Sequence, residues 1–130
     1  MKLSRTSKAA IALLYMVVIF IGSAIPGDHL GDSKLFEMDK LLHAIEYMIL
    51  SLLLCWIFFR NPHELDWYAI RLVVTIGGLY AITDEVHQLF VPKRTFSLMD
   101  LLADFLGLAA GILIFHLYMT KIHPKFRNAI

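Results

Sequence analysis

The chain has 130 residues and a formal net charge of +1, and 58% of its residues are hydrophobic. Soluble domains carry about 45–50% apolar residues, so the composition excludes an ordinary soluble domain and indicates a single-domain integral membrane protein. The near-zero charge, with basic residues in short flanks, argues against nucleic acid as a partner. The lone cysteine, Cys55, lies in an apolar run and cannot form an internal disulfide.

Four apolar stretches are each long enough to cross a bilayer, which needs about 20 helical residues. A proline lies just beyond each stretch, where a helix is expected to stop. The pattern predicts an all-α fold, a polytopic bundle of four transmembrane helices forming one domain over residues 1–130. The predicted helices span about 9–25, 40–60, 67–90 and 97–120.

The first stretch has a second interpretation, because it also has the features of a cleaved signal peptide. Basic residues (Lys2, Arg5 and Lys8) precede its apolar core, and the small residues Gly-Ser-Ala at 22–24 suit a cleavage site. Both interpretations stay open from the sequence, and the other three helices keep the same orientation in either case.

The orientation of the bundle follows from lysines and arginines near the helix ends. With both termini in the cytoplasm, seven such residues fall inside and four outside, so this orientation is predicted. Arg71, near the inner start of the third helix, can reach the same side by extending its side chain. The inner residues are Lys2, Arg5, Lys8, Arg60, Lys121, Lys125 and Arg127, and the outer ones are Lys34, Lys40, Lys93 and Arg94.

Polar residues gather at the outer ends of the last three predicted helices, in the stretches MDKLLHAIEY, TDEVHQ and RTFSLMDLLAD. In the second helix, Asp39, His43 and Glu46 follow helical spacing and share one face, with Tyr47 beside them. In the third helix, the face shared by Asp84, His87 and Gln88 lies one position away from Glu85.

The fourth helix carries Asp100, Asp104, Gly107 and Gly111 along a single stripe. Glycines at helical spacing allow two transmembrane helices to approach closely. The stripe therefore predicts a polar contact at the outer end, with close helix packing below it.

The free-energy cost of placing charged side chains in a membrane indicates that this cluster has a function. A charged side chain at the bilayer centre costs about 2.5–3.5 kcal/mol on insertion scales. Glu46, Asp84, Glu85 and Asp104 lie about one to two turns, or about 5–10 Å, inside their helices. We expect these carboxylates to face one another in a hydrated cleft, with Lys40, Arg94, His43 and His87 as partners, because ionisable groups within a membrane mark functional sites.

Several of these residues also have purely structural interpretations. Asp39 and Lys40 suit a cap of the second helix at the interface, and Asp100 suits the positive end of a helix dipole. His43 alone suits a hydrogen-bonded packing residue, and Arg94 suits a contact with lipid phosphate.

The stretches DKLLHAIEYMIL and TDEVHQLFVPKRTFSLMDLLADFLGLAAG resemble the signature of the VanZ-like family of small bacterial membrane proteins. The resemblance covers residues 10 to 117 or so, with two departures: Asp104 stands where many members carry asparagine, and Lys93 where glycine is frequent. The matching residues are Lys40, His43, Glu46, Tyr47, Asp84, Glu85, Gln88, Phe90, Pro92, Arg94, Asp100, Asp104, Gly107 and Gly111.

The resemblance implies a multi-pass protein of the bacterial plasma (inner) membrane with a role in the cell envelope. The founding member of the family is associated with resistance to the glycopeptide antibiotic teicoplanin, so a resistance role is implied as well. The resemblance implies no particular reaction.

The favoured hypothesis is a polar pocket at the outer face that binds or modifies an envelope lipid or glycolipid headgroup. Cationic side chains would bind phosphate, and carboxylates and histidine would supply acid–base or ligand groups. The candidate catalytic residues are His43, Glu46, Asp84 and Glu85. The candidate binding residues are Lys40, Tyr47, Gln88, Arg94, Asp100 and Asp104.

A divalent metal is a further hypothesis for the same cluster, with His43, Glu46, Glu85 and His87 as candidate ligands. The first alternative function is a non-enzymatic accessory or scaffold protein, in which the polar residues lock the helices together or dock a partner. The second alternative is ion-coupled transport, which is less favoured because the inner halves of the helices offer no matching polar path.

Overall fold

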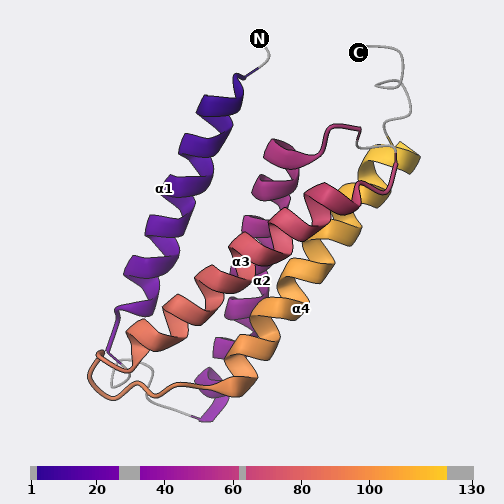
Figure 1. The fold of residues 1–130 in the computed structure, drawn as a ribbon. Helices are drawn as coiled ribbons and strands as arrows, with labels where there is room; N and C mark the ends of the chain where they lie inside the picture. Colours follow the sequence, from indigo (N-terminus) through magenta and orange to yellow (C-terminus); the bar gives the residue numbers. More distant parts are fainter. Residues whose placement is uncertain (1–2, 27–32, 62–63, 123–130) are drawn as a thin grey trace.

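The computed structural model describes residues 3–26, 33–61 and 64–122, and for 33–37 and 122 the backbone alone. Four α-helices run alternately up and down, so α1 begins and α4 ends at the same end of the bundle (Figure 1). The all-α, four-helix prediction is confirmed. The elements are α1 (Arg5–Ser23), α2 (Ser33–Phe58), α3 (Trp67–Gln88), α4 (Leu98–Leu117) and a terminal π-helical turn, η2 (Tyr118–Ile122).

Three helical segments of the described chain are long and apolar enough to cross a membrane: Arg5–Ser23, Met38–Phe58 and Leu98–Lys121. The protein is therefore a multi-pass membrane protein. Helix α3 is not among these segments, and its sequence includes Arg71, Asp84 and Glu85. Its passage through the membrane and the location of the two termini remain predictions.

Helix α2 begins at Ser33, about two turns before the predicted start near residue 40. The added segment, SKLFEMD, contains neither glycine nor proline, so nothing in it interrupts the helix. Asp39 and Lys40 consequently lie well inside α2, and the interpretation of these two residues as its cap was wrong.

Side-chain caps set the start of the other three helices. Ser4 caps α1 by accepting from the backbone N–H of Ser7, and Asp66 caps α3 through that of Ala69. Ser97 caps α4, where its hydroxyl accepts from the backbone N–H of Asp100. A side-chain oxygen at this position satisfies a backbone donor that the helix itself leaves unpaired.

The closest packing in the bundle joins α2 to α4, along a line that we call the α2–α4 seam. A Cβ added at Gly107 would collide with the carbonyl oxygen of Ala44, and one added at Gly111 would lie 2.6 Å from that of Met48. The Ser51 hydroxyl donates to the carbonyl of Leu108 at 2.8 Å across the same seam. The glycine stripe predicted on the fourth helix therefore packs against α2 as expected.

Helix α3 packs on α4 through Gly77 and Gly78, which lie against the side chains of Leu108 and Phe105. Helix α1 is held differently. Most of its apolar residues are exposed, and hydroxyl groups connect it to its neighbours: Tyr15 donates to the carbonyl of Glu46, and Tyr80 donates to that of Met16.

Candidate functional site

The predicted polar residues meet inside one end of the bundle, where α1 and α3 end and α2 and α4 begin; this is the lower end in Figure 1. Burial there is nearly complete, because even the most accessible of the residues named below is only 5% exposed. The expected meeting of the second, third and fourth helices is confirmed. The buried polar residues are His43, Asp84, Glu85, Gln88, Asp100 and Asp104.

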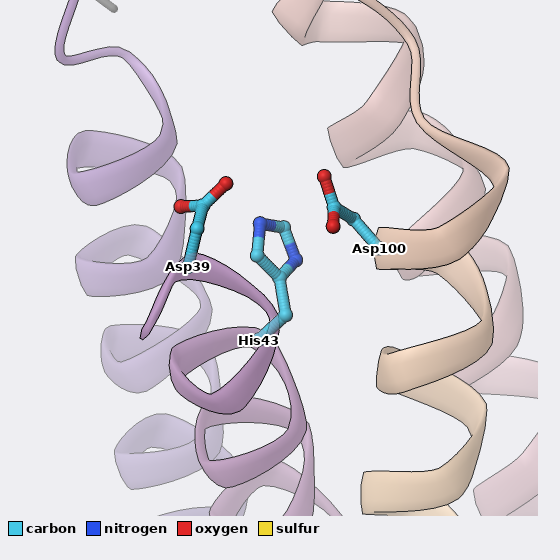
Figure 2. Close-up of side chains that lie close together, drawn as sticks. All are labelled: Asp39, His43 and Asp100. Atoms are coloured by element: carbon cyan, nitrogen blue, oxygen red, sulfur yellow. The ribbon is translucent and has the colours of Figure 1, made fainter. Parts of the chain in front are cut away.

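His43 and Asp104 form the central contact of the cluster. The Nδ1 atom of His43 lies 2.9 Å from Oδ1 of Asp104, joining α2 to α4. Figure 2 shows the imidazole between the carboxyl groups of Asp39 and Asp100. A carboxylate on one ring nitrogen fixes the orientation of a histidine and leaves the other nitrogen to exchange a proton or bind a ligand.

Two cations bind the carboxylates at the rim of the cluster. Lys40 Nζ lies 3.2 Å from Oδ1 of Asp100, joining α2 to α4. Arg94, in the loop after α3, lies 3.4 Å from Oδ2 of Asp39 and donates from Nε to the carbonyl of Ile25. Both cations predicted as partners of the cluster thus pair with its carboxylates, and Arg94 is engaged within the protein.

Glu85 replaces part of the usual cap of α4. In a capping box the third residue of the helix accepts from the backbone N–H of the cap residue. Here the Ser97 N–H donates to Oε2 of Glu85 at 2.8 Å. Asp100, at the position where the capping-box carboxylate would stand, pairs with Lys40 instead.

Asp84 faces α1, a helix in which no site residue was predicted. The Ser23 hydroxyl donates to Oδ1 of Asp84 at 2.6 Å and lies 3.5 Å from Nδ1 of His87. The His87 ring stacks on Phe20, with centroids 4.1 Å apart. No periodicity connects Ser23 with Asp84, which stand 61 positions apart, so only the tertiary structure places this serine in the site.

Several buried polar atoms of the site form no hydrogen bond within the described part of the chain. A buried polar atom without a partner is rare in a folded protein and calls for a specific explanation, such as an ion or a water molecule. The atoms are Tyr47 Oη, Asp84 Oδ2, Glu85 Oε1, Gln88 Nε2 and Asp104 Oδ2.

Two groups of side chains are compact enough to hold a metal ion, with their ligand atoms within 4.8 Å of one another. The first is Asp39, His43 and Asp100, and the second, fully buried, is His43, Glu85 and Asp104. The candidate ligands His43 and Glu85 thus come together. Glu46 and His87 belong to neither group found among the described residues.

A pocket of about 180 Å³ opens beside the cluster, between α1, α2 and the loop after α3. Its wall carries both signs of charge, because Arg94 and Glu46 line it together with His43. Glu46 thus lies beside the buried group rather than in it. The lining residues are Gly22, Ser23, Ile25, Asp39, Leu42, His43, Glu46 and Arg94.

Comparison with known proteins shows a family match and a similar protein. The family model described as VanZ/LLP1 matches residues 6–119. An uncharacterized protein of Schizosaccharomyces pombe is 29% identical over 115 residues, which cover 86% of this chain and 69% of that protein. No solved structure matches the chain.

Proposed function

The chain belongs to the VanZ/LLP1 family of membrane proteins, and on that premise we propose that its pocket binds the phosphate-bearing headgroup of a membrane lipid. The observation that carries the proposal is the pairing of charges on the pocket wall. Arg94 presents a guanidinium and Glu46 a carboxylate to the same space. A zwitterionic headgroup, with a phosphate and an ammonium group, complements such a wall.

The two charges differ in how firmly they are already engaged. Arg94 lies 3.4 Å from Asp39, longer than the roughly 2.7–2.9 Å of a strong charge-assisted hydrogen bond. Its guanidinium can therefore also bind a phosphate. The Glu46 carboxylate forms no hydrogen bond or ion pair with any described residue. An ammonium group in the pocket would give it a partner.

The size of the pocket favours a headgroup over a larger glycolipid. At about 180 Å³ it is smaller than the roughly 300–1,000 Å³ of sites for drug-sized ligands. The relative in a yeast also favours a lipid that bacteria and fungi share, such as an ethanolamine phosphoglyceride. In a bacterial host, binding of an envelope lipid would be compatible with the glycopeptide-resistance role that the family resemblance implies.

The proposed disposition in the membrane follows the distribution of basic residues. Arg5, Lys8, Arg60 and Lys121 lie at the end of the bundle opposite the pocket. Basic residues mark the cytoplasmic side of a membrane protein. We therefore place all four helices across the membrane, with the pocket at the outer face and, in a bacterium, in the plasma membrane.

Titration of the purified full-length protein with a short-chain phosphatidylethanolamine tests the proposal, with the diacylglycerol that lacks the headgroup as the reference ligand. Calorimetry should detect binding of the phospholipid alone. Arg94→Gln and Glu46→Gln should each weaken it about tenfold or more, since each removes a charge contact of about 1.5–3 kcal/mol.

Arg71→Gln and Glu64→Gln remove the same two charge types from exposed positions and serve as matched controls. They should bind like the unchanged protein. Equal affinity for the diacylglycerol, or an unchanged affinity in Glu46→Gln, would contradict headgroup binding at this pocket.

The accessory or scaffold hypothesis is the second candidate, and the polar contacts themselves favour it. The contacts of His43, Lys40 and Ser23 each join two different helices. If the phospholipid does not bind and Arg94→Gln only lowers the unfolding temperature, the polar residues act as a lock for the bundle.

A further inference from the structure

We infer that His43, Glu85 and Asp104 form a binding site for a divalent metal cation, buried behind the pocket wall. The three side chains come from α2, α3 and α4, and their ligand atoms lie within 4.8 Å of one another. Exposure is 5% for His43 and 0% for both carboxylates. The site therefore brings three parts of the chain together at one enclosed point.

Both carboxylates direct one oxygen to the protein and leave the other without a partner. Glu85 accepts from Ser97 through Oε2, and Asp104 contacts His43 through Oδ1. The second oxygens, Glu85 Oε1 and Asp104 Oδ2, are buried and form no hydrogen bond with the described residues. A buried carboxylate oxygen is costly without a partner, and a cation between these two would supply one.

The ion pairs around the cluster also favour a bound cation. Lys40 pairs with Asp100, and Arg94 pairs with Asp39. Both of these pairs use carboxylates other than Glu85 and Asp104, and the ion-pair contact given for Asp104 is with His43. Since buried charges must be paired or bind metal, one divalent cation would balance both carboxylates at once.

The donor set of one imidazole and two carboxylates suits zinc or manganese. In tetrahedral zinc coordination, bonds of about 2.0–2.2 Å place two ligands about 3.3–3.6 Å apart. The ligand atoms of the cluster, which lie within 4.8 Å of one another, would therefore draw together around a bound ion. His43 also lines the pocket, so such an ion would lie next to the pocket wall.

The neighbouring group of Asp39, His43 and Asp100 (Figure 2) is the less suitable of the two. Its carboxylates already bind Arg94 and Lys40. A divalent cation there would have to compete with two positive side chains. The buried group meets no such competitor among the described residues.

Metal content of the purified full-length protein tests this inference, which goes beyond headgroup binding and does not depend on it. The detergent-solubilised protein is stripped with a chelator, reloaded with zinc or manganese chloride, desalted and measured by mass spectrometry. We expect one equivalent of one metal per chain. Glu85→Gln and Asp104→Asn should each lose it, whereas Asp39→Asn and Glu46→Gln should keep it.

Thermal unfolding gives a second readout that does not require any activity. Metal should raise the unfolding temperature of the unchanged protein and leave that of Glu85→Gln and Asp104→Asn where it was. Without metal, both variants should unfold at or above the temperature of the stripped unchanged protein, because a neutral amide replaces a buried carboxylate with one oxygen that has no partner among the described residues.

Three results would each overturn the inference. The first is an unchanged protein that retains no more metal than Asp104→Asn. The second is loss of the metal in Asp39→Asn with retention in Glu85→Gln, which would place the ion at the outer group. The third is equal retention in all four variants, which would indicate surface binding only.

Discussion

The α2–α4 seam and helix α1 represent two different ways of holding a helix in this bundle. At the seam, Gly107 and Gly111 lie so close to the backbone of α2 that an added Cβ would not fit. Along α1, apolar side chains such as Leu13, Leu14 and Ile21 are 62–66% exposed, and hydrogen bonds from hydroxyl groups and from Lys8 link it to α2 and α3.

This difference has a physical cause. Lipid is as apolar as a leucine side chain, so burying one leucine of α1 against another gains little in a membrane. Close backbone contact and interhelical hydrogen bonds remain as the stabilising interactions. The seam has both, because Ser51, His43 and Lys40 bond across it beside the glycines. Helix α1 has hydrogen bonds but no comparable backbone contact in its described part.

Disrupting the packing at the α2–α4 seam should lower the free energy of unfolding more than either of the other changes described below. Gly107→Leu inserts a side chain where even a Cβ would meet the carbonyl oxygen of Ala44. Because backbone cannot move aside cheaply, we expect a loss of about 3 kcal/mol or more in the free energy of unfolding. Titration with a denaturing detergent, followed by circular dichroism, measures this loss.

Ala109→Leu is the matched control, because Ala109 lies on the exposed side of the same helix. It should unfold like the unchanged protein. A similar destabilisation in both variants would mean that close packing at the seam is not the cause.

Detaching α1 should have an intermediate effect. Ser23→Ala removes the hydroxyl that donates to Asp84, and Oδ2 of that carboxylate already has no partner among the described residues. Leaving a buried polar group unsatisfied costs about 1–3 kcal/mol. Hydrogen exchange should show faster opening of α1, while the amides of the seam keep their protection.

Thr6→Ala, at an exposed position of the same helix, is the control for this change. Equal loss of protection in α1 and at the seam after Ser23→Ala would show that the two regions unfold together, contrary to the comparison.

The smallest effect is expected at Asp66, the cap of α3, which lies outside the segments treated as membrane spans. The backbone N–H of Ala69 lowers the pKa of this carboxyl group below its ordinary value of 3.8 against an opposing effect of desolvation, and the N–H of Arg60 adds a smaller lowering contribution. A lowered folded-state pKa contributes stability that is present above the ordinary value and is lost as the pH falls through the folded-state value.

Asp66→Asn keeps a capping oxygen but does not titrate. The unchanged protein should unfold at a higher temperature than Asp66→Asn near neutral pH, and this advantage should disappear as the pH falls below 3.8. Parallel slopes for the two proteins would contradict a role for the charge. The substitution should leave the hydrogen-exchange protection of both the seam and α1 unchanged.

Much of the architecture could be predicted because it rests on local patterns. Hydrophobic run length located the helices, and helical spacing placed Asp100, Asp104, Gly107 and Gly111 on one stripe, which the seam confirms. The family resemblance is confirmed by the matching model. The start of α2 was wrong because an acidic, polar segment was interpreted as a loop.

The backbone conformation at Lys93 bears on one of the two departures from the family pattern. Lys93 has a φ of 59°, in the left-handed region where glycine has no steric penalty. A glycine, which the family resemblance implies at this position in many members, would therefore suit the backbone conformation of the turn. Lysine adopts the same conformation here without stopping the loop from returning the chain to α4.

Sequence by itself determined that the chain forms apolar helices, that polar groups gather at one end, and which residues share a helix face, because these depend on near neighbours along the chain. Only the tertiary structure decided which oxygens are paired. It placed Ser23 on Asp84, Glu85 on the start of α4, and Asp104 on His43. Such contacts depend on how separate helices pack, and no local pattern records the distance between them.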